Sequence, residues 1–164
     1  MLTIFTEEPE RYDKLNNATT TRAYGFVLQQ YKIYNNLTSK VIREGEKDWK
    51  HAEDYSTALD YEKSYEYWKI FMTKYEGEEA KVNVELCQRL IEQIEPMIDY
   101  FTNHNKKEYR SMSLLTAVDH SNSLAVAKLI DIAYVTDFDE GVERDEGVLL
   151  GLMNIKKILN SCLE

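Results

Sequence analysis

The stretch AKVNVELCQRLIEQIEPMIDYF, residues 80–101, decides the fold expected from this sequence. Its apolar residues recur every three or four positions: Ala80, Val84, Cys87, Ile91, Ile94, Ile98 and Phe101. Because an α-helix repeats about every 3.6 residues, this spacing places them all on one face. The stretch is therefore predicted to be a helix with one buried face. Pro96 cannot donate a hydrogen bond to the carbonyl of Glu92, so a kink or restart is expected there.

Three other parts of the chain show the same spacing. They contain Tyr24, Val27, Tyr31, Tyr34 and Val41; Ala58, Tyr61, Tyr65, Trp68, Met72 and Tyr75; and Val148, Leu152, Ile155, Leu159 and Cys162. Helices with apolar faces must bury them against each other. The predicted fold class is therefore all-α: one bundle of about five to six helices. The bundle would span residues 19–164, after a short N-terminal segment, 1–18.

The expected helices follow from these faces and from the breaks between them. Their approximate ranges are 20–43, 47–75, 78–103, a short helix carrying Met112, Leu114, Leu115 and Val118, then 123–134 and 144–162. The chain has only 6 Gly and 2 Pro, whereas hairpin-rich β proteins need more turn residues. Composition therefore also favours helices.

Charge and hydropathy narrow the function classes. The formal net charge is −9, which disfavours direct binding of nucleic acid and favours a basic protein partner. No stretch approaches the roughly 20 apolar residues of a membrane span, and residues 1–10 do not resemble a signal peptide. A cytoplasmic protein without membrane contact is expected. Cys87 and Cys162 both lie on apolar faces and are expected to be reduced core residues.

The first predicted helix has a second apolar face, formed by Phe26, Ile33 and Leu37. A surface helix needs only one such face. The second face is therefore either core or interface, and as an interface it suits a two-fold homodimer. Tyr67 lies off the main face of the next helix, so we expect it at the surface, where tyrosine suits protein contacts.

An acidic segment contains Asp137, Asp139, Glu140, Glu143, Asp145 and Glu146, of which the last three are expected near the N-terminus of the last helix. Its spacing does not match a calcium-binding loop, because Gly141 and Val148 occupy positions where oxygen ligands are needed. We therefore predict no metal site and no cofactor. The carboxylates could instead contact a basic partner or mimic the phosphates of a nucleic acid.

The leading functional interpretation is a non-enzymatic interaction module: a regulator, inhibitor or adaptor that binds a protein through its Tyr/Phe and carboxylate surface. One alternative is a magnesium-dependent, all-α nucleotide pyrophosphohydrolase, in which Glu92 and Glu95, one helical turn apart, hold the metal. Another is an inhibitor that mimics nucleic acid and blocks a basic nucleic-acid-binding protein. Whether the protein is an enzyme stays open at this stage, with the balance against it.

Overall fold

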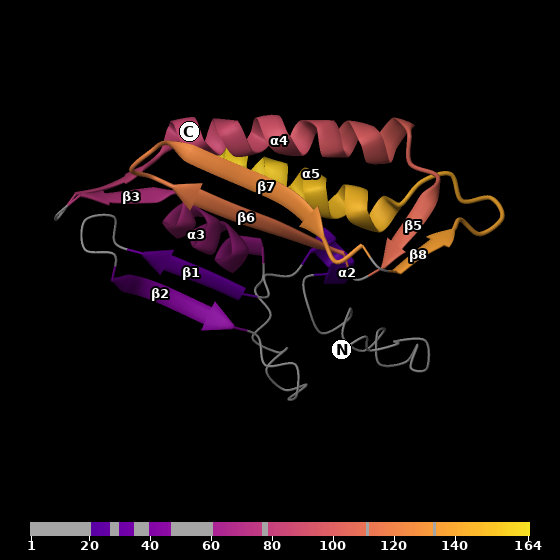
Figure 1. Cartoon of the computed structure of the whole chain (residues 1–164), viewed down its shortest axis with the longest axis horizontal. Coiled ribbons are helices and arrows are strands. Elements are labelled where there is room, and N and C mark those ends of the chain that lie inside the picture. Colours follow the sequence, from indigo (N-terminus) through magenta and orange to yellow (C-terminus); the bar gives the residue numbers. More distant parts are fainter. Residues whose placement is uncertain are drawn as a thin grey trace.

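The computed structural model describes residues 21–26, 30–34, 40–46, 61–76, 79–110, 112–132 and 134–164. These residues form a mixed α/β structure (Figure 1). In chain order the elements are α2 (Thr21–Tyr24), β1 (Gln30–Tyr34), β2 (Val41–Glu46), α3 (Tyr61–Phe71), β3 (Thr73–Glu76), β4 (Glu79–Val82), α4 (Val84–Asn103), β5 (Lys107–Arg110), β6 (Ser113–Asp119), β7 (Leu124–Ile130), β8 (Tyr134–Asp137) and α5 (Glu146–Ser161). The predicted all-α bundle is therefore wrong. The segment 1–18 lies outside the described residues.

Helices α4 and α5 pack against each other, and we call them the helix pair. Both were predicted from their spacing and are confirmed, except that α4 begins only at Val84, because Glu79–Val82 form β4. At the start of α4, the Asn83 side chain accepts a hydrogen bond from the Leu86 N–H at 3.2 Å. Of the kink or restart predicted at Pro96, the restart is wrong, because α4 continues through Pro96, and the kink stays a prediction. Pro96 and Glu92 are exposed, so they lie on the solvent side of the helix, where the loss of one backbone bond is tolerated best.

The core lies between the helix pair, α3 and the strands. Its buried apolar side chains are Trp68, Met72, Leu86, Cys87, Leu90, Ile91, Ile94, Phe101, Ala127, Leu149, Leu152, Ile155, Ile158, Leu159 and Cys162. Most of them come from the two helical faces read in the sequence. Both cysteines are free and buried, as predicted.

Strands replace several predicted helices. Within the expected helix 20–43, β1 and β2 form an antiparallel hairpin instead. Within 47–75, only α3 is helical among the described residues, and the chain then turns into the β3–β4 hairpin. The two short helices expected over 105–134 are β5, β6 and β7. The helical spacing was misleading there because a four- to seven-residue strand offers too few positions to separate the two periods.

Strands β5 to β8 form two nested antiparallel pairs, which together we call the ribbon (residues 107–137). The β6–β7 hairpin lies inside, and β5 pairs with β8 outside it, with Lys107 opposite Asp137 and Arg110 opposite Tyr134. The two registers differ by one residue, because Ser113 is opposite Ile130. One extra residue therefore lies on the arm between β7 and β8, as in a β-bulge.

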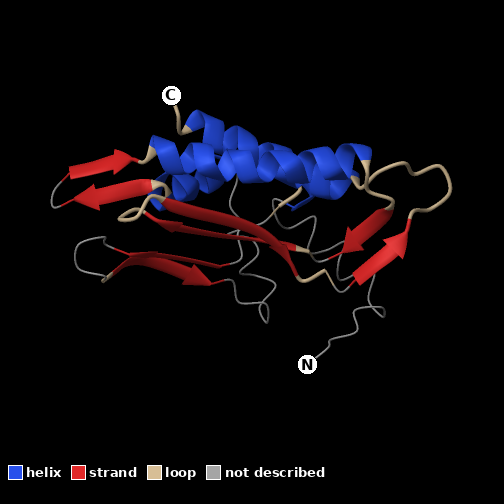
Figure 2. Ribbon diagram, turned by 45° about the horizontal axis from the view of Figure 1, so that its top comes forward, coloured by secondary structure: helices blue, strands red, loops and turns tan. Residues whose placement is uncertain are grey.

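The helix pair forms a layer above the strands (Figure 2). One side chain of α4 joins the layers: Gln93 donates to the Ala125 carbonyl at 2.9 Å and accepts from the Ala127 N–H at 3.0 Å. On α5, a Cβ at Gly151 would lie 2.5 Å from the Gly25 carbonyl oxygen, so only glycine permits this close approach. Among the described residues, no helix is long and apolar enough to cross a membrane.

Candidate functional site

The bulge of the ribbon holds the most unusual carboxylate among the described residues. Asp131 directly follows β7, its side chain is exposed, and its φ is +59°. Residues other than glycine rarely adopt a positive φ, and such strain is concentrated at functional sites. Ser123 shares this conformation, but it lies in the β6–β7 turn, where tight geometry explains it. The carboxylate of Asp131 is therefore the first candidate for chemistry.

Exposed apolar side chains lie on the β6–β7 hairpin, at whose end Asp131 follows. Leu115, Leu124 and Val126 are 54%, 56% and 43% exposed. Their neighbours Ala125 and Ala127 point to the opposite face, where Gln93 of α4 binds the backbone. Strand side chains alternate between faces, so the three exposed residues belong to the face directed away from α4. We call them the open face of the ribbon.

Two cations lie on β5 at the outer end of the ribbon. Lys107 contacts Asp137 at 2.5 Å, and Arg110 contacts Glu108 at 3.2 Å. The bond and charge of Glu108, together with the charge of Asp139, raise the pKa of Arg110 above its ordinary value. All four side chains are at least one-third exposed, so each pair is worth only about 0–1 kcal/mol and can be exchanged for a bound anion.

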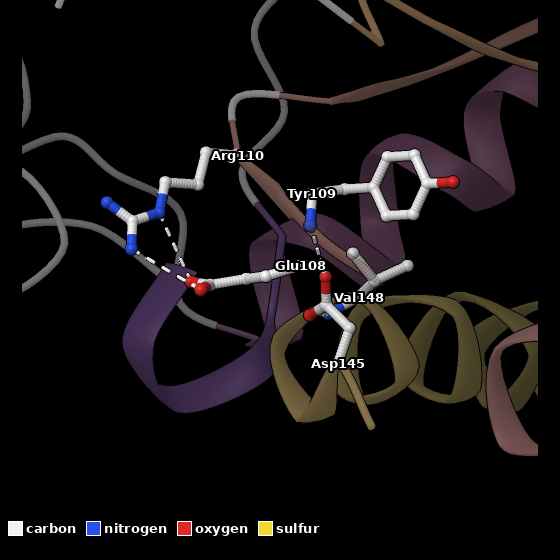
Figure 3. A network of polar contacts seen from close by, with 5 residues as sticks. All are labelled: Glu108, Tyr109, Arg110, Asp145 and Val148. Atoms are coloured by element: carbon white, nitrogen blue, oxygen red, sulfur yellow. Dashed lines mark hydrogen bonds and ion pairs between the residues drawn. The ribbon is translucent and has the colours of Figure 1, made fainter. Parts of the chain in front are cut away.

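Strand β5 is fixed to the helix pair by the buried residue Asp145 (Figure 3). Its carboxylate accepts hydrogen bonds from the Tyr109 N–H at 2.8 Å and from the Val148 N–H at 3.0 Å. The ring of Tyr109 meets that of Phe101 on α4 edge to face, with centroids 5.4 Å apart. Burial, followed by contact with Tyr100 and the charge of Asp145, raises the pKa of the Tyr109 phenol.

The residues predicted to form a second apolar face, as core or as interface, are only partly described. Ile33 lies on β1, not on a helix, and is buried at 6% exposure. Phe26 is half-buried and packs against the core. Leu37 lies outside the described residues. Tyr67 on α3 is half-buried, so it is less accessible than expected.

The predicted acidic residues other than Asp145 are at the surface. Asp137, at the end of β8, and Asp139 and Glu140, just beyond it, are all exposed. Glu92 and Glu95 are also exposed on α4, and Glu95 forms an ion pair with Lys156 of α5 at 2.7 Å. The described residues contain no group of three or more His, Cys, Asp or Glu able to enclose a metal ion.

Sequence reasoning missed both Asp131 and the open face. The useful signal was the turn DHSNS at 119–123, between two short apolar runs, which is typical of a hairpin. With that hairpin in place, Asp131 would have been seen as a carboxylate at the end of a strand. Its positive φ leaves no mark in the sequence.

The fold and this strand-end carboxylate define a class: a mixed α/β protein with an open apolar ribbon beside a strained aspartate. The family model for inositol polyphosphate kinase matches residues 4–160, so the chain belongs to the inositol polyphosphate kinase family. A solved structure from a study of inositol phosphate multikinase has the same fold, with a TM-score of 0.74 and 20% identity. That match covers 98% of this chain and 73% of the other. No curated protein gave a match.

The family overturns the functional interpretation drawn from the sequence. A non-enzymatic regulator, inhibitor or adaptor is contradicted, since the family and the similar structure both point to an enzyme. The all-α pyrophosphohydrolase is contradicted because the family is one of kinases and the fold is mixed α/β. The nucleic-acid mimic is contradicted because the family points to an enzyme. Acidity and helical spacing carried those interpretations, and neither property is specific to a function.

Proposed function

We propose that this protein is a kinase that transfers a phosphoryl group from ATP to an inositol phosphate. The observation that carries the proposal is the family match over residues 4–160. Phosphoryl transfer depends mainly on positioning the reactants and neutralising charge, with little covalent chemistry by the protein. The site must therefore provide a metal–phosphate contact, a surface for the nucleotide base and cations for the substrate.

Asp131 fits the first requirement. Mg²⁺ prefers one or two carboxylates plus phosphate oxygens and water over a cage made only of protein ligands. An exposed aspartate suits that arrangement, and the described residues show no closed cluster of metal ligands. Protein kinases offer an analogy, since an aspartate of their Asp-Phe-Gly segment holds Mg²⁺. When bound, the metal would neutralise charge on the transferred phosphate, and Asp131 would hold it at the end of β7.

The open face and the two cations of β5 fit the other requirements. Leu115 and Val126 offer apolar area on which an adenine base can pack. Binding of the base would explain why these apolar side chains are exposed in the folded protein. An inositol phosphate carries several negative charges, and the protein as a whole has a net charge of −9. Lys107 and Arg110 lie three residues apart on β5 and therefore on opposite faces, so each could bind a phosphate separately by exchanging its weak surface partner.

A phosphoryl-transfer assay tests this proposal. The full chain is incubated with radiolabelled Mg-ATP and a panel of inositol phosphates, from singly to fully phosphorylated. We expect label on at least one of them, and a loss of about 100- to 1,000-fold in Asp131→Asn. Glu92→Gln is the matched control, because it neutralises an exposed carboxylate on α4. Absence of transfer to every acceptor, or full activity of Asp131→Asn, would contradict the proposal.

The remaining expectations from the sequence stay proposals. Two free cysteines support a reducing compartment, so we propose a cytoplasmic location. A basic protein partner, a homodimer, and the absence of nucleic-acid and membrane binding remain predictions. Ile33, one of the residues that motivated the dimer, is buried, and sedimentation of the purified protein is the direct test of a dimer.

A further inference from the structure

Asp145 makes one more hydrogen bond than its place in α5 requires. It is the residue before the helix, and its Oδ1 accepts the Val148 N–H, as a capping side chain does. Its Oδ2 accepts the N–H of Tyr109, a residue 36 positions earlier in the chain. Both oxygens are used, and the residue is only 7% exposed. A buried carboxylate costs free energy, so its second contact calls for an explanation.

The cap of α4 provides a comparison inside the same molecule. Asn83 accepts one hydrogen bond, from Leu86, three residues later. No other side-chain bond of Asn83 is found within the described parts of the chain. One cap is therefore local, whereas the other also holds a distant strand.

A second buried polar residue also holds β5. Asn105, 3% exposed, accepts from the Lys107 N–H at 3.1 Å and donates to the Lys107 carbonyl at 2.6 Å. Three polar or charged residues are buried in the described ranges, and Thr73 is the third. Two of the three therefore bind the backbone of a strand of only four residues, β5.

The position of β5 matters because of what it pairs with. Its partner is β8, which begins three residues after Asp131. A two-stranded pair is marginally stable alone, and a bulge is a point where two parts of a ribbon can bend. Holding β5 against the helix pair therefore limits movement of the bulge, and with it the backbone of Asp131.

We propose that Asp145 is a positioning residue for the kinase site: through the Tyr109 N–H it fixes the β5–β8 pair, and thereby fixes Asp131. Asp145 does not contact the substrate in this scheme. The inference rests on the proposed function for its link to Mg²⁺. The mechanical part, that Asp145 orders β5 and β8, is independent of that function.

The test separates the cap from the strand contact. In Asp145→Ser the hydroxyl can still cap α5 but cannot bind both N–H groups, and Asp145→Asn keeps the size with one acceptor oxygen. Asn83→Ala is the control, because it removes a cap with no strand contact. We expect both Asp145 variants to raise the Mg²⁺ concentration for half-maximal activity about tenfold. The control should keep the wild-type value at a comparable melting temperature.

Hydrogen exchange provides the readout that needs no activity. We expect faster exchange of the amides of β5 and β8 in Asp145→Ser and Asp145→Asn, with α4 unchanged, and the reverse in Asn83→Ala. Wild-type exchange in β5 and β8 of both Asp145 variants would overturn the inference, whether or not the protein is a kinase. Faster exchange with an unchanged Mg²⁺ requirement would overturn the link to Asp131 alone. Absence of phosphoryl transfer in the wild type would refute the proposed function and leave the exchange result to decide the mechanical part.

Discussion

The helix pair and the ribbon use apolar side chains in opposite ways. On α4 and α5 most large apolar side chains are turned inward: Leu90 and Ile94 are fully buried, although Met153 is 58% exposed. The ribbon has apolar side chains on both faces, with Ala127 buried against α4 and Leu115 exposed opposite Lys128. Burial explains the first arrangement, because each large apolar side chain that is removed from water stabilises the fold by about 1.5–3 kcal/mol. The second arrangement gains no such energy from its open face, which indicates a surface kept for a ligand.

The largest expected effect is in the helix pair. Ile94 lies in the middle of α4 with none of its surface exposed, so Ile94→Ala should leave a cavity. We expect a loss of about 2–5 kcal/mol in the free energy of unfolding, measured by urea denaturation. Leu150→Ala on α5, where 39% of the residue is exposed, is the control and should cost clearly less. Equal losses in the two variants would show that the inner face is not the main source of stability.

The next effect concerns the join between the two regions. Gln93 is the side chain that binds the β7 backbone from α4, at Ala125 and Ala127. Gln93→Leu leaves the buried Ala127 N–H without its acceptor, at a cost of about 1–3 kcal/mol. Gln88→Leu, an exposed position on the same helix, is the control. If both variants unfold at the same urea concentration, the helix pair and the ribbon are not coupled through Gln93.

A smaller effect is expected on the open face, and on binding, not on stability. Leu115→Thr keeps a residue that suits a strand but removes apolar area. We expect unfolding to change by no more than about 0.5 kcal/mol, since the side chain is mostly exposed. Calorimetry should show Mg-ATP binding weakened about tenfold. Leu114 lies on the face packed against the core, so Leu114→Ala should lower the stability and leave Mg-ATP affinity unchanged. An unchanged Mg-ATP affinity in Leu115→Thr would show that the open face does not bind the nucleotide.

The same contrast explains what the sequence could reveal. The helices α4 and α5 are long enough, 20 and 16 residues, for several turns of one spacing to accumulate, so both were predicted. In β6, Leu114 and Leu115 are adjacent and both apolar, so the alternation typical of a half-buried strand is broken. Leu115 breaks it because it belongs to the open face. The residues that hid the strand are those proposed to bind the nucleotide, as expected where function overrides local rules.

The site was less predictable than the fold because it depends on backbone geometry and distant contacts. Asp131 stands out only by its φ. Asp145 was expected at the start of the last helix, but its bond to Tyr109 across 36 positions could not be foreseen. Composition pointed away from a kinase, since a net charge of −9 does not suggest a protein that binds phosphates. Net charge averages over the surface, whereas Lys107 and Arg110 act locally.

The smallest effect is expected at the far end of the ribbon, where His120 joins the β6–β7 turn to α3. Its Nε2 lies 3.0 Å from the Phe71 carbonyl, and since a carbonyl only accepts, the ring nitrogen donates. Its Nδ1 is buried without a partner among the described residues. Burial lowers the pKa of His120, the nearby charge of Lys74 adds to this, and the Phe71 bond and the charge of Asp119 oppose it. Protonation would place a second N–H in a buried position with no acceptor.

The pH dependence of stability follows from that lowered pKa. The unfolded chain binds a proton near pH 6.5, whereas the folded chain binds it only at lower pH. The contribution of neutral His120 is therefore complete above about pH 6.5 and is lost as the pH falls through the lower, folded value. In His120→Gln the amide can still donate to Phe71 but does not titrate. We expect the melting temperature of the wild type to fall more than that of the variant between pH 7.5 and pH 5, since the other ionisable groups are common to both. If the melting temperatures of the wild type and the variant fall equally between pH 7.5 and pH 5, protonation of His120 does not affect the stability of the β6–β7 turn.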